Sequence, residues 1–112
     1  MVLVKATGMD ESQQASYREL RDVHRSRVED FQQQNRQLRG QLFELLAQKD
    51  QNDYEVHLLA DSIADIKRQE ELLTFEHFRQ VREICRPDQQ LKFDAAIGEA
   101  IQSMGPPKQR RN

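Results

Sequence analysis

The stretch LLTFEHFRQVREICRPDQQLKFD, residues 72–94, decides the fold of this chain. Its first half continues a helical pattern, with steps of four, four and three residues between Leu73, His77, Val81 and Ile84. These steps place the four side chains on one face of a helix. Pro87 cannot continue that helix, because it has no N–H and its ring clashes with the preceding turn, but it is well tolerated as the first residue of a new one. The stretch therefore predicts two helices that meet at Pro87, with His77 on the apolar face of the first.

Two long runs of the same spacing lie outward from this corner. One runs from Tyr17 to Leu45 and the other from Val56 to Ile84, and the polar run QKDQND between them predicts a turn. Two long helices joined by a short turn pack antiparallel. The sequence thus predicts an all-α fold, with a long antiparallel helical hairpin over about residues 10–48 and 53–85. A shorter C-terminal helix over about residues 87–103 would give the hairpin a hook.

The boundaries follow from local signals. We expect a flexible segment over residues 1–9, one helical domain over 10–103 and a disordered tail over 104–112. Asp10 and Ser12 are candidate N-caps for the first long helix, and Asp53 for the second. Because a two-helix hairpin leaves each apolar seam half covered, and the third helix covers one end only, we expect a homodimer.

Composition excludes several classes of function. In 112 residues, 37% are hydrophobic and 32% charged, which is typical of long amphipathic helices. A net charge of −2 gives no reason to expect nucleic acid as a partner. The single cysteine excludes an internal disulfide framework. The sequence has no nucleophile with a facing base and no glycine-rich phosphate loop, so we expect no enzyme.

Two histidines give the most specific prediction of the spacing. With the turn centred near Gln51, residues whose numbers sum to about 102 face each other, so His24 lies opposite His77. Two imidazoles on adjacent helices could bind Zn, Cu, Ni or Co, with Glu76 beside His77 as a candidate further ligand. The alternative is that each histidine is a seam residue hydrogen-bonded to a neighbour. We interpret His57 as structural or exposed.

The remaining polar and thiol groups on the seam have structural interpretations. Asn35 and Glu70 interrupt the apolar pattern, and a single buried polar residue of this kind often fixes register or oligomeric state. Cys85 ends the apolar stripe of its helix, which favours a small buried thiol over a metal ligand.

A family resemblance covers about residues 9–101. The stretch TFEHFRQVREICRPDQQLKFD resembles the C-terminal part of the Spy/CpxP-like and heavy-metal-sensor group of bacterial periplasmic proteins. The residues that carry the resemblance are Cys85, Arg86, Pro87, Asp88 and Gln89, followed by Lys92, Phe93 and Asp94. A second, weaker copy stands at residues 9–13, and QNRQLRGQLFELLAQ resembles the first long helix of the family. Cys85 and Arg86 replace the usual Leu and Thr.

The resemblance implies a hooked, dimeric helical hairpin that is exported to the periplasm, often with an inner-membrane anchor that lies outside this chain. Its first functional implication is a non-enzymatic metal-sensing or heavy-metal resistance domain that binds a transition metal through His24 and His77. The usual additional ligands are replaced, because Leu20, Val28 and Val81 stand at their positions.

Two other functions remain open from the sequence. One is an ATP-independent chaperone of the envelope stress response, which holds unfolded proteins and predicts an exposed apolar patch lined by basic groups. The other is a helical dimer that relays a signal to a membrane-bound regulator.

Overall fold

The computed structural model describes residues 2–104, and these residues are almost entirely helical. Four α-helices and one short 3-10 helix follow one another, and the described residues contain no strand: α1 Val2–Thr7, α2 Glu11–Glu44, η1 Leu45–Ala47, α3 Asp53–Ile84 and α4 Pro87–Met104. The predicted all-α fold, a helical hairpin followed by a C-terminal helix, is therefore confirmed. The expected tail lies outside the described residues, apart from Met104 at the end of α4.

Contacts divide the chain into two compact units. One unit is Glu19–Arg79, and the other combines the residues up to Arg18 with those from Gln80 onward. Each long helix contributes to both units. The first is called the hairpin unit below, and the second the terminal unit.

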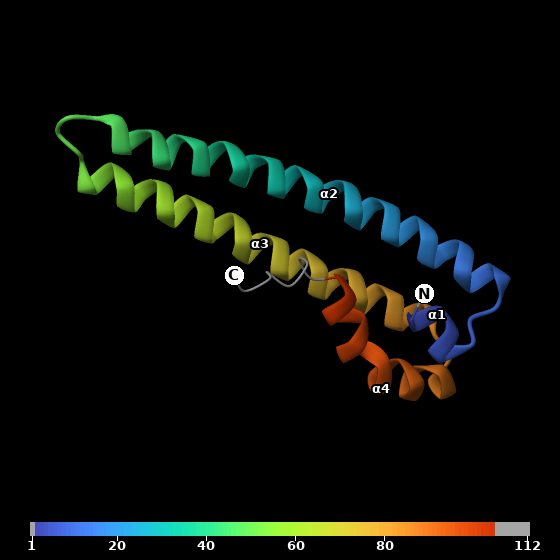
Figure 1. Ribbon diagram of the computed structural model, residues 1–112. Coiled ribbons are helices and arrows are strands. Elements are labelled where there is room, and N and C mark those ends of the chain that lie inside the picture. The colour runs from blue at the N-terminus through green and yellow to red at the C-terminus, as the bar shows by residue number, and fades with distance from the viewer. Residues whose placement is uncertain (1, 105–112) are drawn as a thin grey trace, which may run out of the picture. The chain divides into compact units, whose positions relative to one another are not determined.

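The hairpin unit consists of two antiparallel arms from α2 and α3, joined by η1 and a short turn (Figure 1). The first arm ends at Glu44, earlier than the predicted boundary at residue 48, and η1 tightens the last turn. The second arm begins at Asp53, but its cap is Asn52, whose Oδ1 accepts a hydrogen bond from the Glu55 N–H at 3.2 Å. Asp53 is thus the first helical residue and not the N-cap.

The seam of the hairpin is thinly covered. Leu45 and Ile66 are buried apolar residues of the seam, whereas most other seam positions are half-buried. Two helices can bury only one side of each other, so this pattern is what a hairpin without a third layer produces. The polar seam residues also differ from one another: Glu70 is paired with Lys67 at 2.8 Å, while the buried Oδ1 of Asn35 has no hydrogen-bond partner.

In the terminal unit, residues Val2–Thr7 form helix α1, where the sequence predicts a flexible segment over 1–9. Leu3 and Thr7 are buried, and α1 packs against α4. The helix ends at Gly8, which has φ +70° and donates its N–H to the Val4 carbonyl at 3.1 Å. Glycine is the residue that enters this left-handed conformation without a steric penalty.

The starts of α2 and α4 follow the predicted capping. Asp10 Oδ1 accepts from the Gln13 N–H at 2.8 Å, and Gln13 Oε1 accepts from the Asp10 N–H at 2.9 Å, which is a reciprocal capping box. Asp10 is therefore the N-cap that the sequence predicted. Pro87 is the first residue of α4, also as predicted.

Candidate functional site

The structure brings His24 and His77 together across the hairpin. Their rings stack with centroids 4.4 Å apart and an interplanar angle of 19°. Both residues are only 6% exposed, and the edge of Phe78 packs on His77 with ring centroids 4.7 Å apart. The facing pair predicted from the turn position is thus confirmed as a contact between buried rings.

The surroundings keep both imidazoles neutral. Burial lowers the pKa of His24, although the charge of Glu70 acts in the opposite direction. Burial and, to a smaller extent, the neighbouring His24 together lower the pKa of His77 to about 4. His24 Nε2 lies 2.9 Å from Thr74 Oγ1, whose hydroxyl is also 3.0 Å from the Glu70 carbonyl oxygen. The pair is therefore held by stacking and a hydroxyl contact.

Glu76 does not join the two histidines. Its carboxylate pairs with Arg79 at 3.0 Å and is about half exposed. Adjacent residues of an α-helix point about 100° apart, so the neighbour of a buried histidine faces water. Within residues 2–104, no three His, Cys, Asp or Glu side chains converge on a point that could hold a metal ion. Metal binding requires the in-plane nitrogen lone pairs, whereas the stacked rings present their faces to each other.

The motif residues of the terminal unit form an amide network. Gln89 is 1% exposed, and its Nε2 donates to the Gly8 carbonyl and to Gln13 Oε1, each at 3.2 Å. Gln13 Nε2 returns a bond to Gln89 Oε1 at 2.7 Å and donates to the Ile84 carbonyl at 3.0 Å. The Arg86 N–H also donates to Gln89 Oε1, at 2.8 Å. Every polar atom of these two side chains has a partner, so the network is structural.

The other motif residues support the same corner. Arg82 bonds both carboxylate oxygens of Asp94, at 2.8 and 2.9 Å, and this contact lowers the pKa of Asp94. Asp88 lies 3.6 Å from the Arg86 guanidinium. Phe93 is buried, as is Cys85, which confirms the interpretation of Cys85 as a buried thiol. Burial raises the pKa of Cys85, so it is a poor nucleophile at neutral pH.

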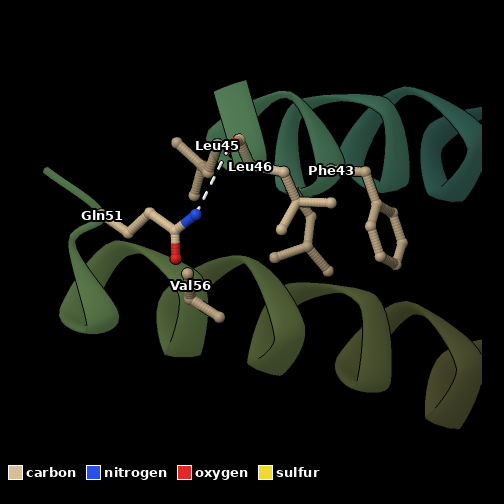
Figure 2. A pocket seen from close by; sticks show the side chains of 6 residues that line it. Phe43, Leu45, Leu46, Gln51 and Val56 are labelled. Carbon is tan, nitrogen blue, oxygen red and sulfur yellow. Dashed lines mark hydrogen bonds between the residues drawn. The ribbon is translucent and has the colours of Figure 1, made fainter. Parts of the chain in front are cut away.

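Exposed apolar side chains in the hairpin unit are features that the sequence analysis missed. Six residues line a hollow of about 180 Å³ where the two arms meet the turn: Leu42, Phe43, Leu45, Leu46, Gln51 and Val56. This set is called the tip hollow below. Phe43 is 54% and Leu46 67% exposed, and Figure 2 shows Phe43 on α2 and Leu46 on η1, with Val56 on α3. The Arg39 guanidinium lies over the Phe43 ring, 5.5 Å from its centroid.

The comparisons with known proteins give no relative. No family model, no curated protein and no solved structure matches the chain. Among the described residues, no helix is long and apolar enough to cross a membrane.

Proposed function

We propose that this chain is a non-enzymatic holdase of the Spy/CpxP-like type, which binds apolar segments of unfolded proteins without a nucleotide. The observation that carries the proposal is the tip hollow, where exposed apolar side chains stand beside an arginine. A chaperone of this kind requires an accessible apolar surface with basic groups next to it. The resemblance of residues 85–94 to the Spy/CpxP-like group supports the same function.

The size and chemistry of the tip hollow suit side chains of a polypeptide. At about 180 Å³ it is smaller than the roughly 300–1,000 Å³ of sites that enclose a small molecule. Gln51 is its one polar lining residue, and Gln51 Nε2 donates to the Leu46 carbonyl at 3.4 Å. Little in the hollow would select one polar ligand over another, which is what a binder of many unfolded chains needs.

Removing the apolar side chains at the tip hollow tests this function. The wild-type chain should delay the aggregation of an unrelated, chemically unfolded protein, as followed by light scattering without ATP. The double variant Phe43→Ser, Leu46→Ser should lose most of that effect. Leu91→Ser, Ile101→Ser is the matched control, because it removes two exposed apolar side chains of α4 in the terminal unit. No delay by the wild type, or an equal delay by the Phe43→Ser, Leu46→Ser variant, would contradict the holdase function.

Transition-metal binding by His24 and His77 is the second candidate function. The observation that favours it is the contact of two imidazoles whose lowered pKa values keep them neutral, which is the form that ligates metal. Binding of Zn, Cu, Ni or Co requires the stack to open and further ligands to join. A metal-sensing or heavy-metal resistance role would follow from such binding.

Calorimetric titration tests the metal site. The chelator-treated chain is titrated with Zn, Cu, Ni and Co beside the double variant His24→Ala, His77→Ala. Binding that the double variant loses, and that a variant of the exposed His57, His57→Ala, retains, would support the site. Absence of binding by the wild type, or binding unchanged in the double variant, would exclude it.

Location and partners belong to the same proposal. The resemblance supports export to the periplasm. A membrane-bound regulator is the partner in the alternative where the helical protein relays a signal. Fractionation of cells that express the protein checks the location.

A further inference from the structure

Helix α3 carries a second regular stripe on the side opposite the hairpin seam. Tyr54, Leu58, Leu72 and Phe75 are its apolar members, with exposed fractions of 72%, 48%, 58% and 63%. Asp61, Asp65, Arg68 and Arg79 are its charged members, all exposed. Together the eight residues follow one another at steps of four and three without a break. This set is called the outer stripe below.

The spacing of the outer stripe is that of a coiled-coil seam. Steps of four and three repeat every seven residues, which keeps a stripe facing one partner helix along its length. The seam toward α2 runs through Leu59, Ile63 and Ile66, so at 100° per residue the outer stripe lies on the far side of α3. It spans residues 54–79, which is about 38 Å of helix. Within the hairpin unit this face is exposed to solvent.

The outer stripe is complementary to itself when two copies run antiparallel. We propose that a second copy of this chain packs along the outer stripe, with the two-fold axis between Asp65 and Arg68. Each layer of an antiparallel coiled coil joins one position of the stripe to the symmetric position of the partner. Leu58 then meets Phe75 of the partner subunit, and Asp65 meets Arg68 of the partner subunit.

The outer layers agree with this register. Tyr54 meets Arg79 of the partner subunit, a pairing of an aromatic ring with a guanidinium. The same chemistry already occurs within the chain, where Arg79 lies 5.1 Å from the centroid of the Phe75 ring. The mismatched pairing is Asp61 against Leu72 of the partner subunit, and the two-fold axis places it in two layers. A parallel dimer would instead place Asp65 against Asp65 and Arg68 against Arg68, so charge repulsion selects the antiparallel one.

The central charges of the stripe already have partners on their own helix. Arg68 Nη2 lies 2.8 Å from Asp65 Oδ1, and Gln69 Nε2 donates to Asp65 Oδ2 at 2.8 Å. In the dimer each charge retains its neighbour on the same helix and gains one from the partner. This proposal makes the expected homodimer specific, and it does not depend on the holdase function, because the tip hollow shares no residue with the outer stripe.

Charge reversal tests the register, with the dimer dissociation constant of the full chain measured by analytical ultracentrifugation. Asp65→Arg places like charges in the two central layers, and Arg68→Asp does the same with the opposite sign. Each single variant should raise the dissociation constant by about tenfold or more. An equimolar mixture of the two variants should form a heterodimer, because every central layer then pairs opposite charges. The mixture cannot repair the ion pair within one helix, so rescue by mixing reports the contact between chains.

Asp30→Arg is the matched control, since Asp30 is an exposed acid on α2. It should leave the dissociation constant unchanged. A crosslinking pair checks the register independently in a Cys85→Ser background: Leu58→Cys, Phe75→Cys should oxidise to a covalent dimer, while Leu58→Cys, Leu72→Cys should not. A monomeric wild type, a dimer indifferent to the single reversals, or a mixture without heterodimers would overturn the proposal.

Discussion

We expect His77 to make the stability of the hairpin sensitive to acid. Its pKa of about 4 lies below the ordinary value of 6.5, because burial and the adjacent His24 disfavour the imidazolium. Between these two pH values the His77 imidazole is protonated in the unfolded chain but not in the folded chain. The free energy of unfolding should therefore fall as the pH drops from about 6.5 to about 4, by an amount on the order of 2–3 kcal/mol.

Urea unfolding at pH 7 and pH 5 measures this dependence. His77→Phe keeps a ring on the apolar face and removes the titrating group, so the difference between the two pH values should shrink. His57→Gln is the control, because His57 is exposed, and it should keep the wild-type difference. An unchanged difference in His77→Phe would show that His77 does not carry the acid sensitivity.

The sequence predicted the His24–His77 contact because it depends only on where the turn lies and on the three-and-four spacing. It did not predict the partners of the pair. Thr74 stands between Leu73 and Phe75 in the sequence, and nothing in the pattern marks its hydroxyl as the contact of His24. Glu76 was selected because it adjoins His77 in sequence, yet one step along a helix turns the side chain toward water, where it pairs with Arg79.

At the scale of elements, α1 depends on its contact with α4. A helix of six residues is too short to be stable alone, because nucleation is unfavourable and few hydrogen bonds follow it. Leu3→Ala should therefore release α1 and lower the free energy of unfolding by about 2–3 kcal/mol. Thermal unfolding measures the loss, and Val23→Ala, at an exposed apolar position of α2, should change it little. A loss equal in the two variants would mean that α1 does not contribute to the terminal unit.

The shortness of α1 explains why the sequence predicted a flexible segment over residues 1–9. Six residues give too few turns for a periodic pattern, and the visible signals are only Leu3 and Thr7 four residues apart and Gly8 behind them. The long helices were predictable because their patterns repeat over many turns. The ends of the long helices were less predictable. Asn52 and Asp53 are both good N-cap residues for α3, and the choice between them depends on the path of the turn.

At the scale of the whole molecule, association should make stability depend on concentration. If two chains pair along the outer stripe, a higher protein concentration stabilises the folded dimer by mass action, and the melting temperature rises. Phe75→Glu should flatten that rise, because it replaces the apolar side chain that would pack against Leu58 of the partner subunit. Leu91→Glu, on α4, should not. Scanning calorimetry over a range of protein concentrations distinguishes the two variants. A wild-type melting temperature that does not depend on concentration would count against dimerisation along the outer stripe.

A homodimer is expected from the half-covered seam, but the sequence did not predict the outer stripe as the face along which we propose that it forms. Asp61, Asp65 and Arg68 interrupt the apolar positions of the outer stripe, so a search for apolar periodicity finds only the seam toward α2. The sequence did not predict the tip hollow, for a different reason. Phe43 and Leu46 lie beside the seam positions Leu42 and Leu45 in sequence, and only the path of the chain at η1 shows that they are exposed.

The bond between Gln13 and Gln89 joins residues 76 positions apart, and each of them closes the first turn of its own helix. Neither helix start can fray without breaking the amide pair, so the first turns of α2 and α4 open as a single event. Amide hydrogen exchange would register this as one shared opening rate for backbone N–H groups at both places. Because Gln89 also holds the Gly8 carbonyl, the end of α1 belongs to the same cooperative unit.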